Sequence, residues 1–296
     1  MRRWLLVMMG IPLALFSATV KNQIQWLNAV YFSGGIETKV VVSHEEKFPF
    51  LQGKSLLTKE NFLLWKVFGE ISPVSFNAGG EVSLSPLAIL VFSGGGKVGT
   101  GWTFLSFTGL ALNPSSNTNH TQTPTPFGGA VIELWGKGAF QFDTGAIIPG
   151  EWSHVLLYTE HALNYRMLTS ADETTPWLYE VDSGQNYNGW RYLTTSVIAY
   201  QMPLLLRNIG CLLSTTTRIS HREDSPLASS GWGSDYTEWV FGPLAYFEGK
   251  HHSLTILLQW YTERQYSLKE GHFTTWKYEK TDVKPYRIAL SYAYRF

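Results

Sequence analysis

The chain has 296 residues, of which 16% are charged and 15% aromatic, and its formal net charge at pH 7 is zero. The charged fraction lies below the roughly 25% of an average soluble domain, whereas twelve Trp and fifteen Tyr are many for this length. Balanced charge argues against nucleic acid as a partner, and the single cysteine, Cys211, excludes an internal disulfide. This composition favours an aromatic-rich β-protein, either soluble or with Trp and Tyr at a water–hydrocarbon boundary.

The N-terminal segment has the layout of an export signal. Arg2 and Arg3 supply positive charge, residues 4–16 are apolar, and Ser17-Ala18 offers a small-residue cleavage site. Phe16 is large where a small residue is preferred, so a retained anchor is the alternative, although the apolar run is short for a bilayer. We therefore predict a signal peptide over residues 1–18 and one domain over residues 19–296.

Alternation of apolar and polar residues then predicts ten strands. They cover residues 30–43, 62–84, 88–104, 130–144, 152–166, 190–202, 208–222, 236–247, 254–263 and 286–296. Within 62–84 the polar residues change parity, which indicates a β-bulge near Ser72-Pro73. The loop over 169–189 has room for a small hairpin at 177–181.

The connections between these segments alternate in length. Short turns are expected near Ser85, Ile148, Leu205 and Lys250, and long loops near Glu46, Ser116, Asp182, Ser225 and Lys277. Short periplasmic turns, long extracellular loops and an even strand number are typical of membrane barrels. The sequence thus predicts an all-β, antiparallel, up-and-down transmembrane β-barrel of about ten strands, within a range of 8–12. A soluble sandwich has no reason to sort its loops by length.

The terminal strand, residues 286–296, has one wholly apolar or aromatic face and one small or charged face. Its length suits a membrane-spanning strand of about 9–11 residues. With Tyr292, Tyr294 and Phe296 it resembles the closing strand of bacterial outer-membrane β-barrels. That resemblance implies residence in the outer membrane, contact with its lipid, and recognition of these three residues by the β-barrel insertion machinery. Residues 72–77 and 99–102 also resemble uncharacterised outer-membrane barrels of spirochaete type, which implies no activity.

Charged residues on the polar parity of the strands are candidates for the barrel lumen. Charges in a low-dielectric wall are stable when paired, so we expect cross-strand ion pairs there. Because eight-stranded barrels are filled by side chains and large porins are not, about ten strands indicate a narrow lumen. The lumen-facing candidates are Glu37, Lys39, Lys66, Glu70, Glu81, Lys97, Glu133, Lys137, Asp143, Glu160, Arg166, Arg191, Arg218, Glu238, Glu263, Arg287 and Arg295.

The patterns that suggest enzymatic chemistry are weak. His251-x-Ser253 resembles half of the outer-membrane phospholipase motif, but Leu254-Thr255 follow where that family has Asn-Gly, and the triplet falls at a short turn. Residues 94–97 lack the spacing and the helix of a phosphate loop. We expect no catalytic residue, metal ligand or cofactor.

The functional prediction is an outer-membrane barrel that acts as a narrow channel or as a structural barrel, and that accepts a small solute or a hydrophobic ligand. One alternative is a binding barrel or adhesin that presents the loops at 108–129, 169–189 and 223–235. A second alternative is a lipid hydrolase that uses His251 and Ser253.

Overall fold

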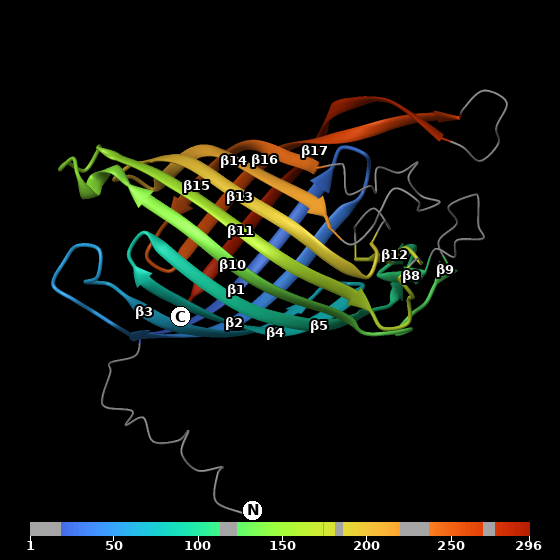
Figure 1. Cartoon of the computed structure of the whole chain (residues 1–296), viewed down its shortest axis with the longest axis horizontal. Helices are drawn as coiled ribbons and strands as arrows, with labels where there is room; N and C mark the ends of the chain where they lie inside the picture. Colours follow the sequence, from blue (N-terminus) through green and yellow to red (C-terminus); the bar gives the residue numbers. More distant parts are fainter. Residues whose placement is uncertain (1–18, 113–122, 174, 181–185, 220–236, 269–275) are drawn as a thin grey trace, which may run out of the picture.

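The computed structural model describes residues 19–112, 123–173, 175–180, 186–219, 237–268 and 276–296 (Figure 1). The segment assigned to a signal peptide lies outside these ranges. Among the described residues, twelve antiparallel strands form a closed barrel in which β1 pairs with β17. The described part contains no helix long and apolar enough to cross a membrane. The predicted fold class is confirmed, and the strand number lies at the upper end of the expected range.

The strands lie in chain order around the wall, apart from short ones within the connections. The barrel strands are β1 (Thr19–Tyr31), β2 (Ile36–Pro49), β3 (Phe62–Ile71), β4 (Ser75–Leu87), β5 (Leu90–Gly101), β10 (Val131–Asp143), β11 (His154–Leu168), β13 (Gly189–Gln201), β14 (Leu206–Arg218), β15 (Thr237–Glu248), β16 (His252–Leu268) and β17 (Trp276–Arg295). The other elements are β6 (Thr103–Phe104), β7 (Phe107–Thr108), β8 (Leu110–Leu112), β9 (Thr123–Pro124), β12 (Trp177–Tyr179) and the 3-10 turn η1 (Thr144–Ala146).

The first predicted strand, 30–43, is wrong because it runs across a tight hairpin. Strand β1 ends at Tyr31, residues 32–35 turn, and β2 starts at Ile36. Gly34 and Gly35 have φ of 88° and 119°, in the region that favours glycine. A four-residue turn keeps the apolar parity, since Val30 pairs with Ile36, so the pattern alone shows no break.

The long strand predicted over 62–84 is also two strands. Residues 72–74 form a three-residue turn, closed by a hydrogen bond from the Ser72 amide to the Ser75 carbonyl at 3.0 Å. An odd number of turn residues reverses the parity, which the sequence pattern shows as a slip in register. The parity change near Ser72-Pro73 therefore marks a hairpin and not a bulge.

Two predicted loops are placed incorrectly and three short turns correctly. Glu46 lies within β2 and Lys277 within β17, so neither is in a loop. The long connection after β2 covers residues 50–61 instead. It lies at the rim where β1 begins and β17 ends. The turns near Ile148, Leu205 and Lys250 are confirmed, and the turn expected near Ser85 lies at residues 88–89. Ser116, Asp182 and Ser225 lie outside the described residues.

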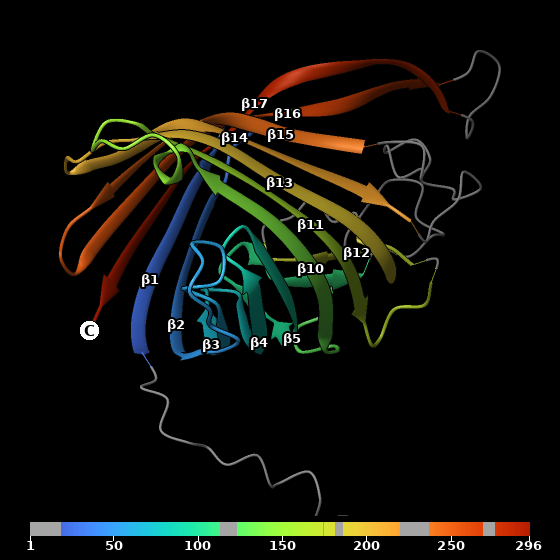
Figure 2. The ribbon, with the colours of Figure 1, turned by 60° about the vertical axis from the view of Figure 1, so that its left-hand side comes forward.

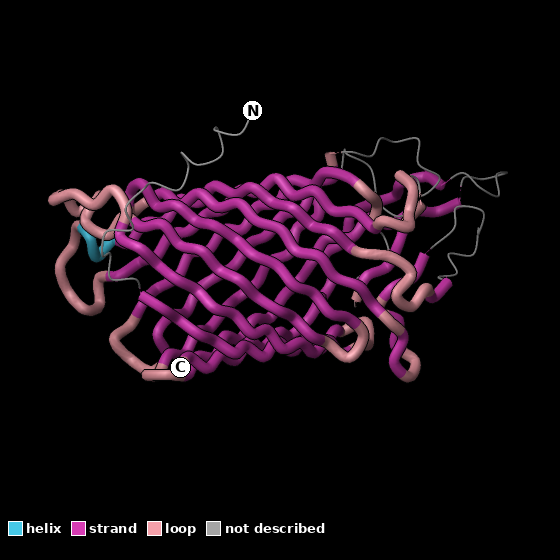
Figure 3. Tube along the Cα trace, turned by 90° about the horizontal axis from the view of Figure 1, so that it is seen from below, coloured by secondary structure: helices cyan, strands magenta, loops and turns pink. Residues whose placement is uncertain are grey.

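The two faces of the wall differ sharply. Outward side chains are large, apolar and exposed, for example Trp26, Val42, Val82, Ile198 and Ile209, each 50–55% accessible. Side chains on the other face reach across an intervening strand and contact each other. The Trp135 indole on β10 donates to Glu81 on β4, and Arg191 on β13 pairs with Glu133 on β10. Such convergence occurs on the concave side of a closed sheet, so the charged face is the inner one. Figure 3 shows the tilted strands that make up this wall.

Candidate functional site

Two long connections at the rim opposite the chain ends fold back onto the inner wall. Strands β8 and β9 from one connection and β12 from the next form a three-stranded sheet, here called the inner sheet. Trp177, Tyr179 and Leu110 of this sheet are at most 2% exposed and pack on Val131 and Leu168 of the wall. Figure 2 shows β12 beside β10 and β11, within the outline of the barrel. The apolar residues of β8 and β12 therefore form a local core inside the barrel.

Glycines allow the inner sheet to lie close to the wall. A Cβ on Gly99 would lie 2.5 Å from the Tyr179 hydroxyl oxygen, and a Cβ on Gly109 would overlap the Val74 carbonyl. The space that glycine leaves allows the Tyr179 hydroxyl to donate a hydrogen bond to Asn77 Oδ1 at 2.8 Å. Glycine is required where another part of the chain approaches the backbone this closely.

Glu180, the residue after β12, ties the inner sheet to two wall strands. Its Oε2 lies 2.7 Å from Lys39 Nζ on β2, and its Oε1 accepts from Ser75 Oγ at 2.8 Å and Asn77 Nδ2 at 3.0 Å on β4. The Glu180 backbone has φ of 60°, a left-handed conformation that costs a non-glycine residue about 1–3 kcal/mol. These polar contacts offset that strain.

The pKa of Glu180 reflects the same contacts. Burial alone would raise it, but the charge of Lys39 and the hydrogen bonds from Lys39 and Ser75 hold the pKa of this carboxyl below its ordinary value. The carboxylate is therefore charged while the inner sheet is docked.

A second acid, Glu133, is the centre of the charges beneath the inner sheet. It lies 3.5 Å from Lys97, 3.8 Å from Arg166 and 3.3 Å from Arg191, and Asn164 Nδ2 donates to it at 2.9 Å. Glu70 lies 3.6 Å from Lys39 and 3.9 Å from Lys97, which joins Glu133 to the Glu180 contacts. The seven residues of this mouth cluster are Lys39, Glu70, Lys97, Glu133, Arg166, Glu180 and Arg191.

The other candidates from the sequence lie elsewhere on the inner face. The remaining polar contacts are Lys66 with Glu45 at 3.0 Å, Lys137 with Glu81 at 3.1 Å, Arg287 with Glu37 at 3.3 Å, Arg295 with Glu248 at 3.0 Å, Asp143 with His154 at 2.8 Å, Glu160 with the Tyr158 hydroxyl at 2.9 Å, and Glu263 with Lys284. Arg218 lies directly opposite Arg191, with Glu238 on the next strand. The structure thus gathers six of the seventeen candidates in the mouth cluster.

Sequence reasoning missed Glu180, Tyr179 and Asn164 as site residues. The small hairpin expected at 177–181 is instead a strand, β12, paired with β8 from another loop. The buried aromatic pair of Trp177 and Tyr179 within a polar loop was the signal that this segment packs against something. No pattern in the sequence indicates which wall it packs against.

The histidines at and beside the short turn of residues 249–251 contact the closing strand. His251 Nδ1 lies 3.2 Å from the Arg295 carbonyl oxygen, and His252 Nδ1 lies 2.6 Å from the Tyr292 hydroxyl. Ser253 pairs with Glu248 and Ala293 in the wall. These contacts attach both histidines to the closing strand. Within the described ranges, no three His, Cys, Asp or Glu side chains are grouped to hold a metal ion.

The similarity of this chain to known proteins is distant. No family model matches the chain, and no curated protein matches it. Several solved structures do. The KdgM porin is 12% identical, with 93% of this chain and 99% of the porin covered and a TM-score of 0.41. The β domain of the Bordetella autotransporter BrkA is 9% identical (94% and 98% covered, TM-score 0.41), and OmpT of Vibrio cholerae is 6% identical (94% and 97%, TM-score 0.40). The closed antiparallel barrel and its apolar outer face follow from this chain's own strand pairing and side-chain exposure.

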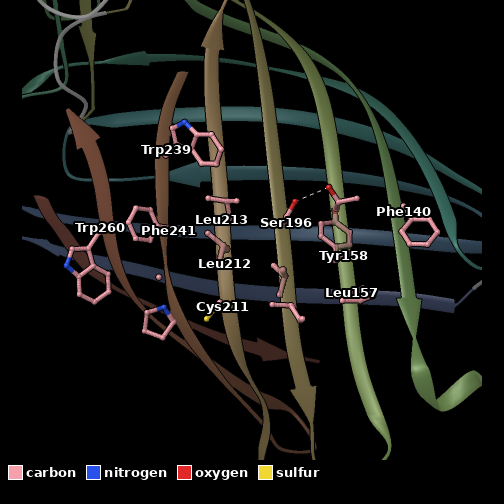
Figure 4. Close-up of a pocket in the computed structure, with 15 residues that line it drawn as sticks. Phe140, Leu157, Tyr158, Ser196, Cys211, Leu212, Leu213, Trp239, Phe241 and Trp260 are labelled. Atoms are coloured by element: carbon pink, nitrogen blue, oxygen red, sulfur yellow. Dashed lines mark hydrogen bonds between the residues drawn. The ribbon is translucent and has the colours of Figure 1, made fainter. Parts of the chain in front are cut away.

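A hollow of about 940 Å³ lies on the outer face over β10 to β16 (Figure 4). Small side chains, Ser196 and Cys211 among them, form its floor, and Phe140, Trp239 and Trp260 stand around it. The pairing of β15 with β16 is interrupted at Gly242-Pro243, because proline has no amide hydrogen to donate. A surface this apolar is suited to hydrocarbon and not to water.

Proposed function

We propose that the protein resides in a bacterial outer membrane and provides a narrow passage whose selectivity is set by the mouth cluster. The observation that carries the proposal is a set of seven charged side chains held together inside a closed wall with an apolar exterior. Fixed charges at a constriction act strongly on passing solutes, because the local dielectric is low.

The inner sheet supports a narrow passage over a wide one. It occupies the space against β4, β5, β10 and β11 at one rim, and the Lys39–Glu180 ion pair holds it there. In the Lys39–Glu180 pair the side chains are only 11% and 16% exposed, which indicates close packing with little free water around them. A small solute fits this arrangement better than a folded polypeptide does.

Planar-bilayer recording tests the proposal. The refolded barrel should give small, discrete conductance steps, and a Glu133→Gln variant should shift the reversal potential in a salt gradient toward anion selectivity. The reason is that Lys97, Arg166 and Arg191 then lose their shared carboxylate. Glu248→Gln, at the opposite rim beside Arg295, is the matched control and should change selectivity less. A barrel that closes, as shown by heat-modifiable migration on a cold detergent gel, yet never conducts would rule out the channel.

The terminal strand supports a second part of the proposal, recognition by the insertion machinery. Tyr292, Tyr294 and Phe296 are 42%, 39% and 62% exposed on the outer face, with Tyr294 and Phe296 stacked. A Phe296→Ala chain should accumulate in the periplasm, while a Phe92→Ala chain with an outer-face change in β5 should insert normally. Equal insertion of both variants would count against this role.

A further inference from the structure

The outer face of the barrel carries a group of uncharged polar side chains near its mid-height. They lie on three neighbouring strands, β11, β13 and β14, where His161 pairs with Thr194 and Thr194 with Thr215. His161 is exposed and is the middle residue of the 15-residue strand β11. The six members of this polar patch are Thr159, His161, Tyr192, Thr194, Ser196 and Thr215.

Alternation along the strands places the polar patch on the outside of the wall. His161 has the parity of Leu163, which is 51% exposed, and Thr194 has the parity of Ile198, which is 55% exposed. On the opposite wall, six strands away in the ring of twelve, Val42 holds a comparable position near the middle of β2 and is 51% exposed. At mid-height this side of the barrel therefore turns polar groups toward hydrocarbon, whereas the other side turns an aliphatic group.

Hydrogen bonds within the polar patch satisfy its members only in part. The contacts are Thr159 with Ser196 at 2.9 Å (the dashed line in Figure 4), Thr159 with His161 at 3.3 Å, His161 with Tyr192 at 2.6 Å, and Thr194 with Thr215 at 2.7 Å. Only one proton lies between two bonded hydroxyl oxygens, so the second hydroxyl proton of the Thr194–Thr215 pair needs an acceptor of its own. Hydrocarbon offers none, and polar groups left in it are costly. A protein surface over the patch would supply such acceptors.

A second copy of the barrel has the complementary surface at the right depth. Two copies insert with the rim that holds the chain ends on the same side of the membrane, so a two-fold axis between them runs along the membrane normal. Each side chain then faces others at its own depth, and the polar patch of one copy meets that of the other. Hydroxyl and imidazole groups both donate and accept hydrogen bonds, so the patch is complementary to itself. Its six side chains include no carboxylate, lysine or arginine, so it has no preference for a partner of opposite charge.

The hollow on the outer face gives the side chains of a second copy room. Thr159 and Ser196 belong both to the polar patch and to the lining of this hollow. Trp239, which pairs with Thr215 and is 44% exposed, stands at its edge (Figure 4). A recess bordered by large rings allows two identical surfaces to interlock, because a ring of one copy can enter the recess of the other.

We propose that the outer surface of β11, β13 and β14 is the contact between two copies of this chain, with the polar patch at its centre. Small and hydroxyl-bearing side chains are favoured in contacts between membrane-spanning segments, where they hydrogen-bond across the interface. This inference rests on the membrane residence in the proposed function and is independent of conduction.

Cross-linking of the full chain in outer membranes tests the contact. Cysteines are placed one at a time at Thr194, Ser196 and Thr215 in a Cys211→Ser background, which allows for the exact position of the axis. Val42→Cys in the same background, on the opposite wall, is the matched control. Oxidation with copper phenanthroline, which enters the membrane, should join at least one patch variant into a covalent dimer of this chain, with a yield several-fold above that of Val42→Cys.

A second variant tests whether the polar side chains drive the association. His161→Leu should weaken association by roughly tenfold, because each copy loses the hydrogen bonds of its imidazole and the change counts twice in a dimer. Energy transfer between donor- and acceptor-labelled barrels, followed as liposomes are diluted with lipid, measures this change. Leucine is favoured in hydrocarbon, so the barrel should still close, which gel mobility of the unheated variant verifies. Val42→Leu should associate as the parent does.

The outcomes separate this inference from the channel. The contact is wrong if the patch cysteines give no more dimer than Val42→Cys, if they are joined to a different protein instead, or if His161→Leu and Val42→Leu associate alike. A membrane-embedded monomer that conducts overturns this inference alone. A chain that fractionates away from the membrane overturns the proposed residence as well.

Discussion

Replacing Lys39 by methionine should release the inner sheet from the wall. Lys39 Nζ lies 2.7 Å from Glu180 and 3.6 Å from Glu70, and its side chain is 11% exposed. Removing one partner of a buried ion pair costs about 3–5 kcal/mol when the remaining charge stays buried. Glu180 belongs to a connection and not to the wall, so it can regain water by undocking. We therefore expect this free-energy cost to weaken docking. The docked state should be disfavoured by about 10²- to 4 × 10³-fold, since 1.4 kcal/mol is a factor of ten.

Amide hydrogen exchange at Leu178 and Glu180 measures this loss. Leu178 pairs with Ala111 of β8 and the Glu180 amide donates to the Gly109 carbonyl at 2.8 Å, so both amides are protected while the inner sheet is formed and docked. Lys66→Met is the control, because Lys66 pairs with Glu45 of the neighbouring wall strand at 3.0 Å. The reasoning is refuted if Lys39→Met leaves exchange at these two amides at the parent rate, or if Lys66→Met accelerates it equally.

Three further predictions concern the same contacts. The pKa of Glu180 is lower in the docked state, so the stabilisation of docking by Glu180 is present above the ordinary glutamate pKa of about 4.3 and is lost as pH falls through the lowered pKa. Trp177 fluorescence should therefore report undocking on acidification. In a Glu180→Gln variant docking is already weakened at neutral pH and should depend less on pH. Gly99→Ala should also displace the inner sheet and speed exchange at Glu180, whereas Gly136→Ala, with open space around its Cβ, should not. Tyr179→Phe should destabilise docking by about 1 kcal/mol through the lost hydrogen bond to Asn77, a change visible as a modest shift in the same exchange rates and absent in the unrelated Tyr200→Phe.

Alternating polarity was enough to predict the barrel and most of its strands. From β10 to β15 the predicted and observed strands agree closely, because each turn there breaks the alternation. The last two strands are longer than the predicted 254–263 and 286–296, since β16 runs to Leu268 and β17 begins at Trp276. The turn at residues 32–35 was not predicted because it leaves the alternation of apolar and polar positions unchanged. The turn at 72–74 was interpreted as a bulge because it reverses that alternation, as a bulge would. Periodicity records which face a residue occupies, not how often the chain reverses.

The candidate site could be predicted only in part from the same alternation. Charged residues at alternate positions could be assigned to one face of a strand, and the structure pairs most of them. Which of them meet depends on the stagger between strands and on wall curvature, so Arg191 and Glu133, 58 residues apart, could not be matched from the sequence.

The sequence by itself determined a barrel with an apolar exterior and a charged interior, since a strand's two faces follow directly from a period of two. Tertiary structure alone decided that β8 and β12, from separate connections, join inside the wall, and that Glu180 reaches Lys39 from 141 residues away. Contacts of this kind depend on closure of the sheet, which brings distant strands together around one interior. No local pattern in the chain encodes that proximity.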